Sequence, residues 1–95
     1  MYARVTSFQV DPARLPEMVA KIGELKSATK AMKGVVDTYV VWRADGQGVV
    51  TSVFESKAAA DAAVSQAQAV WGGLAGLLKG GPKPEAFDNV AHLSG

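Results

Sequence analysis

The order of patterns along the chain constrains its fold more than any other feature. Two segments of alternating side chains, residues 35–43 and 49–55, flank an Asp45-Gly46 pair near the centre of the 95-residue sequence. Asp-Gly between alternating segments is typical of a β-hairpin turn. A long amphipathic stretch lies on each side of the hairpin, and a short strand pattern closes each end. This order predicts a ferredoxin-like α+β fold, β-α-β-β-α-β, with two helices on one face of a four-stranded antiparallel sheet.

The first strand and helix have clear boundaries. Residues 2–10 alternate, so that Tyr2, Arg4, Thr6 and Phe8 share one face of a strand and Ala3, Val5 and Ser7 share the other. Asp11-Pro12 predicts a helix start, but Pro16 would remove a backbone hydrogen bond, so the regular helix should begin near it. Gly34 is expected to end the helix. Its buried stripe is predicted at Leu15, Met18, Val19, Ile22, Leu25, Thr29 and Met32.

The second helix is predicted to begin after Ser56, whose side chain would cap it. Three glycines weaken its second half and predict a local distortion there. The helix should end at residues 79–82, and residues 87–93 are predicted to form the last strand. Its buried stripe is predicted at Ala60, Val64, Ala67, Trp71, Leu74 and Leu78.

Both faces of the hairpin carry apolar side chains, which is unusual for a sheet with one wet face. One helical layer can cover only one of them. The chain is also 48% hydrophobic, more than a domain of this size easily buries. We therefore expect a homodimer that forms through the open sheet faces. The first strand is expected to pair with the third in parallel, which would place Val53 at the centre of the sheet.

Charge and composition exclude several kinds of partner. Ten basic and nine acidic residues give a net charge of +1, without the clustered basic surface that nucleic acid binding needs. The chain has no cysteine, no apolar run near the roughly 18 residues of a membrane helix, and no signal-peptide pattern. We expect a cytoplasmic protein of one domain, residues 1–95, with no nucleic acid or membrane partner.

Four residue types could carry chemistry, and each has an ordinary structural alternative. His92 is the only histidine, and a surface position is commoner than an acid–base role. Trp71 lies in the stripe of the second helix, where core packing is the commoner role and lining a ligand pocket the alternative. Asp37 and Asp88 could act as bases if buried, but exposure is the commoner outcome. No known catalytic or phosphate-binding motif is present.

Two arginines could each meet an anion. Arg4 lies within the first strand and Arg43 lies beside the Asp45-Gly46 turn. Surface placement, with little energetic consequence, is the commoner outcome for such residues.

Several short segments resemble the antibiotic biosynthesis monooxygenase family across nearly the whole chain. They are Tyr2-Ala3-Arg4-Val5-Thr6, Asp11-Pro12-Ala13-Arg14, the Asp45-Gly46 hairpin, Phe54-Glu55-Ser56 before an Ala-rich helix, and Pro84-Glu85. The resemblance implies a dimeric α+β barrel, in which two ferredoxin-like subunits press their sheets together. It also implies a ligand cavity between the sheet and the helices of each subunit.

The resemblance also carries functional expectations. Heme-degrading members have an Asn on the first strand and a Trp and a His on the second helix. Here Trp71 lies well past the matching place near Ala63, and Asn89 and His92 belong to the last strand. This argues against heme degradation. Quinol-oxidising members are cofactor-free, so the resemblance implies a monooxygenase-family protein without cofactor or metal.

The implied ligand is a small aromatic or quinol-type molecule between sheet and helices. It would stack on Trp71 and be oriented by polar groups among Ser7, Ser52 and His92. The alternative is a non-catalytic ligand-binding or structural dimer that keeps the fold.

Overall fold

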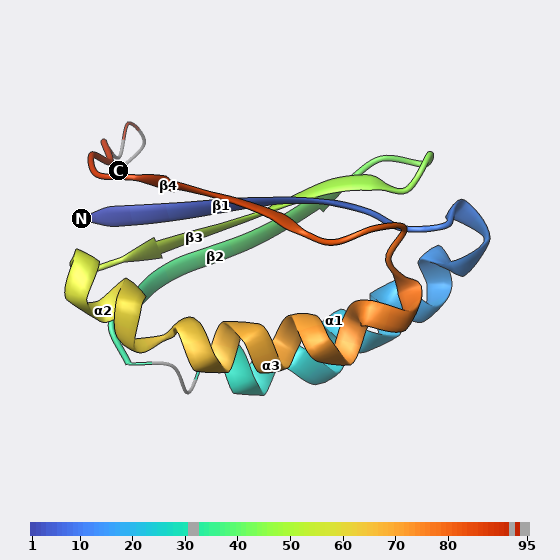
Figure 1. The fold of residues 1–95 in the computed structure, drawn as a ribbon, viewed down its shortest axis with the longest axis horizontal. Coiled ribbons are helices and arrows are strands. Elements are labelled where there is room, and N and C mark those ends of the chain that lie inside the picture. The colour runs from blue at the N-terminus through green and yellow to red at the C-terminus, as the bar shows by residue number, and fades with distance from the viewer. Residues whose placement is uncertain (31–32, 92, 94–95) are drawn as a thin grey trace.

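A computed structural model describes residues 1–30, 33–91 and 93 of the chain. Figure 1 shows one sheet and one layer of helices beneath it. The strands are β1 (Tyr2–Gln9), β2 (Val35–Trp42), β3 (Gln47–Phe54) and β4 (Lys83–Phe87). The helices are α1 (Leu15–Lys30), α2 (Lys57–Ala62) and α3 (Val64–Leu74), with 3-10 turns η1 (Pro12–Arg14) and η2 (Ala75–Leu77). This is the predicted ferredoxin-like α+β fold.

The sheet has the strand order β2-β3-β1-β4, and every neighbouring pair is antiparallel. The expected parallel pairing of the first and third strands is therefore wrong. The α1 crossover returns the chain in the direction of β1, and the hairpin then reverses it, so β3 must run against β1. Val53 does lie on a central strand, opposite Ala3 of β1 and Asp37 of β2.

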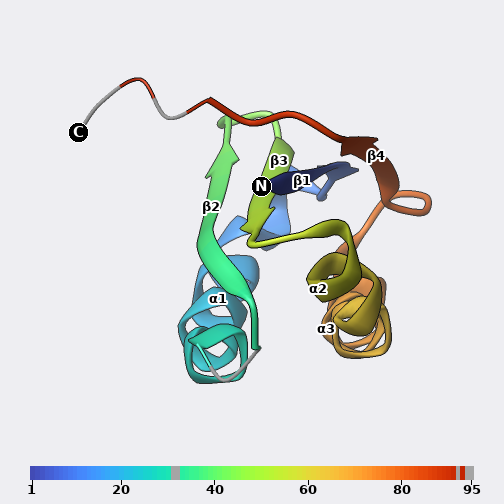
Figure 2. The same cartoon turned by 90° about the vertical axis from the view of Figure 1, so that its left-hand side faces the viewer.

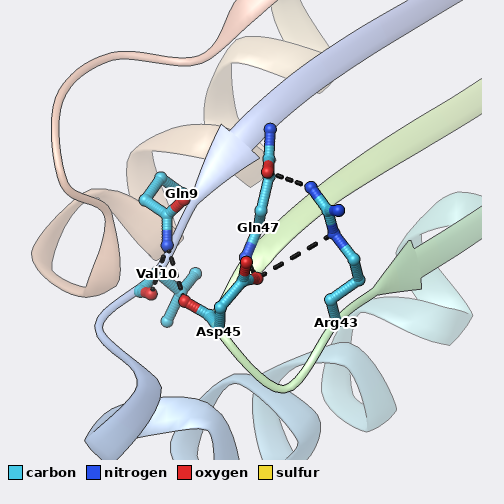
Figure 3. Close-up of polar contacts among 5 residues, drawn as sticks. All are labelled: Gln9, Val10, Arg43, Asp45 and Gln47. Atoms are coloured by element: carbon cyan, nitrogen blue, oxygen red, sulfur yellow. Dashed lines mark hydrogen bonds and ion pairs between the residues drawn. The ribbon is translucent and has the colours of Figure 1, made fainter.

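The hairpin turn lies where the sequence predicts it and is hydrogen-bonded to the end of β1 (Figure 3). Gly46 has a φ of +88° and donates its backbone N–H to the Arg43 carbonyl oxygen at 2.9 Å. Its own carbonyl oxygen accepts the Val10 N–H at 2.9 Å. The Gln9 side chain donates to the Asp45 carbonyl oxygen at 2.9 Å. A Cβ on Gly46 would lie 1.9 Å from the Val10 carbonyl oxygen, so only glycine fits this contact.

Helix α1 begins one residue before Pro16, as expected, and its described part ends at Lys30. The predicted buried position of Val19 is wrong, because its side chain is 48% exposed on the outer surface of α1. The predicted stripe residue Met32 lies outside the described residues. Gly34 has a φ of +79°, a conformation that favours glycine, and leads directly into β2.

The second helical segment differs from the continuous helix that the sequence predicts. Ser56 caps it as expected, because its hydroxyl oxygen accepts the Ala59 N–H at 3.1 Å. The α-helix is interrupted at Ala63, whose N–H is shared between the Ala59 and Ala60 carbonyl oxygens at 3.1 and 3.2 Å. A second change, to the 3-10 turn η2, falls in the glycine-rich half where a distortion was expected.

The predicted last strand, residues 87–93, is also wrong, because β4 begins four residues earlier at Lys83. The chain joins the edge of β1 as soon as the helices end. Lys79 donates its N–H to the Gln9 carbonyl oxygen at 2.7 Å, and Val10 bridges to Leu78. Pro84 has no backbone N–H to donate. An edge strand such as β4 tolerates this, because on its outer side no neighbouring strand needs that hydrogen bond.

The helices cover one face of the sheet only. In Figure 2, α1 lies under the β2 edge and α2 and α3 lie under the β4 side. Two buried clusters fill this layer, one of Tyr2, Phe54, Ala60 and Ala63, the other of Phe8, Val10, Met18 and Leu77. We call the other side of the sheet the open face. By register it presents Val5, Val49, Thr51 and Val53 at its centre and Tyr39, Val41 and Phe87 toward its edges.

Candidate functional site

A cavity of about 650 Å³ lies between α1, α3 and the helix-facing side of the sheet. Its walls are mainly aliphatic and come from all three elements. They include Met18 and Ile22 of α1, Val40 of β2, Val50 of β3, and Val70 and Leu74 of α3. The cavity arises because α1 packs toward one edge of the sheet and α3 toward the other, which leaves the middle uncovered.

Aromatic rings form part of the cavity wall. Trp71 projects from α3 onto Phe8 of β1, with the two ring centroids 5.8 Å apart and the rings tilted by 54°. Trp42, at the end of β2, lines the same cavity and is 41% exposed. An aromatic ligand between these side chains would find both stacking and edge contacts.

A polar row crosses the sheet at one end of the cavity. Arg4 of β1 lies opposite Ser52 of β3, which in turn lies opposite Thr38 of β2. Directly opposed side chains have their Cβ atoms roughly 5 Å apart. These residues, with Thr6, line a small recess of about 80 Å³. We call Arg4, Ser52 and Thr38 the polar row.

The recess and the cavity share part of their walls. Thr38 and Val50 line both, and so does Trp71. Thr38 of the polar row therefore borders the cavity itself, and Trp71 borders the recess as well as the cavity.

Ion pairing in the described residues lies outside the cavity. The three ion pairs are Arg14–Glu17 at 2.9 Å, Lys21–Glu24 at 3.5 Å and Arg43–Asp45 at 4.0 Å, and all are largely exposed. The hydrogen bond that the Arg14 guanidinium donates to the Glu17 carboxylate raises the pKa of Arg14. Within the same part of the chain, Arg4 makes no ion pair or side-chain hydrogen bond.

The other charged groups of the lining are exposed at the cavity mouth. They are Lys26 and Lys30 of α1 and Asp37 of β2. Residues 1–30, 33–91 and 93 contain no group of three His, Cys, Asp or Glu side chains that could hold a metal ion.

The structure brings together two of the four predicted ligand-binding residues. Trp71 lines the cavity and Ser52 belongs to the polar row. Ser7 does not join them, because it is exposed on the open face, opposite Val49 and Lys83. A strand alternates its faces, and the neighbours of Ser7 point toward the helices. His92 lies outside the described residues.

Sequence reasoning gave Arg4 a surface position and did not consider Thr38 as a site residue. The alternation of the first strand did indicate partial burial of Arg4, because Arg4 shares a strand face with Tyr2 and Phe8, both of which are buried. Thr38 gains its place in the site from the register of β2 against β3, which puts it opposite Ser52.

A four-stranded antiparallel sheet with its helices on one face defines the ferredoxin-like class of α+β domain. The family model for antibiotic biosynthesis monooxygenases matches residues 1–69, so the chain belongs to that family. Among curated proteins, none matches this sequence.

Solved structures share the whole fold at low sequence identity. A protein of unknown function from Nitrosomonas europaea is 17% identical, with a TM-score of 0.83 over 99% of this chain and 93% of that one. Rv0793 from Mycobacterium tuberculosis is 17% identical, with a TM-score of 0.78 over 98% of each chain. A candidate antibiotic biosynthesis monooxygenase from Caulobacter crescentus CB15 is 19% identical, with a TM-score of 0.80 over 95% of this chain and 90% of that one. At these identities the likeness shows the fold alone. None of the helices in the described ranges is long and apolar enough to cross a membrane.

Proposed function

We propose that residues 1–95 act as a single domain that binds a small aromatic, quinol-type molecule in the cavity and oxygenates it without a cofactor. The observation that carries this proposal is the apolar cavity of about 650 Å³ beside Trp71. Its size falls within the roughly 300–1,000 Å³ of small-molecule sites. Membership of the monooxygenase family supports the reaction type.

In this reaction the substrate supplies its own electrons. One oxygen atom of O₂ becomes a carbonyl oxygen on the ring carbon para to a phenol, which converts the phenol into a quinone. The other oxygen atom leaves as water, with the phenolic hydrogen and the displaced ring hydrogen. The protein's part is to hold the ring, exclude water and stabilise the electron-rich phenolate. Trp71 and the aliphatic wall would hold the ring, and the polar row would contact the oxygen.

The proposal includes a homodimer formed through the open face. Tyr39, Val41 and Phe87 are 63%, 59% and 45% exposed there. Exposed apolar patches of this kind are uncommon on monomers and typical of interfaces. A twofold symmetric contact between two open faces would cover them.

A second candidate is a non-catalytic ligand-binding dimer. It is favoured by the cavity lining, where the described acid and amine groups, Asp37, Lys26 and Lys30, are exposed and none is a buried base. A phenol would then have to lose its proton to solvent or to a group outside the lining. Such a protein would bind the same aromatic molecules without consuming oxygen.

Oxygen uptake and binding, measured on the same samples, separate the two candidates. The probe is 1-naphthol, which has a free ring position para to its hydroxyl, with oxygen followed by an electrode and binding by tryptophan fluorescence. The variant Trp42→Phe leaves Trp71 as the only tryptophan, and Trp71→Phe serves as its matched control. We expect saturable quenching with Trp71 present, and oxygen uptake that saturates over the same range. Saturable binding with no uptake above the protein-free rate would replace the oxygenase with the binding protein.

A further inference from the structure

We propose that the polar row binds the carboxylate of an aromatic acid whose ring lies in the cavity against Trp71. This inference rests on the proposed function, because it specifies the ligand of the same cavity. It adds a carboxylate to the phenol that the proposed function requires, so that the ligand is an anionic, hydroxylated aromatic acid.

Arg4 is the observation that carries the inference. It lies half-buried on β1 between Tyr2 and Thr6, which are 8% and 6% exposed. By register it is the one basic residue among the helix-facing positions of the four described strands. A guanidinium partly withdrawn from water is destabilising unless an anion or hydrogen-bond acceptor compensates it. The described part of the chain offers it no carboxylate, so an anionic ligand is the natural partner.

The neighbours of Arg4 suit an oxyanion. Ser52 and Thr38 each carry a hydroxyl that can donate one hydrogen bond, and they follow Arg4 in a straight line across three strands. The one carboxylate in the lining, Asp37, is exposed at the cavity mouth. The row therefore combines a cation with hydroxyl donors and contains no acid that would repel an anion.

The planar guanidinium selects among oxyanions. Its fork of N–H donors matches the two oxygens of a carboxylate, and such charge-assisted pairs are about twice as strong as neutral hydrogen bonds. A phenolate presents a single oxygen and would use only part of the fork. Because Thr38 and Trp71 line both the recess and the apolar cavity, the carboxylate should be attached directly to an aromatic ring.

Two probes of nearly equal shape test this. The first is 1-naphthoate and the second is its neutral analogue 1-naphthamide, with affinities measured by titration calorimetry. We expect wild-type protein to bind 1-naphthoate more tightly. Arg4→Met should weaken 1-naphthoate about ten- to a hundredfold and change 1-naphthamide by less than about twofold. Arg43→Met, the same substitution outside the cavity lining, should change neither affinity. Arg4→Lys, which keeps the charge and loses the fork, should give an intermediate loss.

Each other result has a definite meaning. Equal wild-type affinities for the two probes would overturn the carboxylate site and leave the cavity as an aromatic site. An equal loss of both probes in Arg4→Met would also overturn it, because Arg4 would then only support the fold. Binding of neither probe would count against the proposed function as well.

Wild-type protein alone gives a further test, should Arg4→Met fail to fold. Added salt should weaken 1-naphthoate and leave 1-naphthamide unchanged, because only the charged probe is screened. The same salt response for both probes would contradict the proposal.

Discussion

On the helix-facing side of the sheet, Phe8 and Val10 are 7% and 1% exposed under α1 and α3, whereas on the open face Tyr39 and Val41 are 63% and 59% exposed. Both sides are built by the same alternating strands, and both are rich in valine. The difference lies in the polar residues among the valines. The helix-facing side carries the polar row and a cavity, while the open face carries Ser7 and Thr51 among its valines and, by register, Lys83 and Glu85 at the β4 edge. We infer that the first side is organised around a ligand and the second around a partner subunit.

The open face gives the largest expected effect. Val53→Asp should remove the soluble dimer and lower the free energy of unfolding by about 3 kcal/mol or more, because it places an unpaired carboxylate in the proposed interface. Size-exclusion chromatography with light scattering, together with thermal melting, measures both. Val19→Asp, on the outer surface of α1 at 48% exposure, is the control and should remain dimeric. If Val53→Asp remains dimeric with an unchanged melting temperature, the open face is not the dimer interface.

The hairpin turn sets the register on which both faces depend. Gly46→Ala should lower the free energy of unfolding by about 3 kcal/mol, because a side chain there needs a strained φ and overlaps the Val10 carbonyl oxygen. Chemical denaturation measures the change. Gly23→Ala, in α1 with open space around its Cβ position, should instead stabilise by about 0.5–1 kcal/mol. Similar values for the two variants would show that the contact between the turn and β1 is not formed.

The two tryptophans sharpen the distinction between cavity wall and cavity mouth. Trp71→Ala should lower stability by about 2 kcal/mol, because the half-buried ring packs on Phe8, and should abolish saturable 1-naphthol binding. Trp42→Ala should cost about 1 kcal/mol and weaken binding less. Denaturation and titration calorimetry give both quantities. A larger loss of binding in Trp42→Ala than in Trp71→Ala would place the ligand nearer the cavity mouth.

The smallest expected effect on stability concerns the cap at the start of α2. This helix packs against the buried side chains of Tyr2 and Phe54. Ser56→Ala should lower stability by about 1 kcal/mol through loss of the hydrogen bond from the Ala59 N–H. Ser27→Ala, at an exposed position within α1, should be neutral or slightly stabilising. Equal effects in the two variants, measured by denaturation, would show that the cap does not contribute.

The sequence predicted those parts of the fold that depend on neighbouring residues. The hairpin turn follows from Asp45-Gly46, the start of α2 from Ser56, and the start of α1 from Pro16. These signals are local, because a turn or a cap requires particular backbone and side-chain chemistry at one place. The order of elements was enough to define the fold.

The errors arose where pairing between distant segments decides the structure. The direction of β3 relative to β1 follows from the crossover and not from any residue of β3. The position of β4 was missed because Pro84 does not suggest a strand, although an edge allows it. Ser7 was taken as a cavity residue, but a strand places adjacent residues on opposite faces. Arg4 gained its significance only from the strand register, which places Ser52 opposite it and Thr38 opposite Ser52.

Fluorescence of the Trp42→Phe protein, titrated with 1-naphthol, tests the central claim most directly, because Trp71 is then the only tryptophan and lies in the cavity wall. The account predicts quenching that saturates at one ligand per chain and protects Trp71 from quenching by acrylamide. Quenching that rises linearly without saturation, with no protection from acrylamide, would show that the helix-facing cavity is not a ligand site.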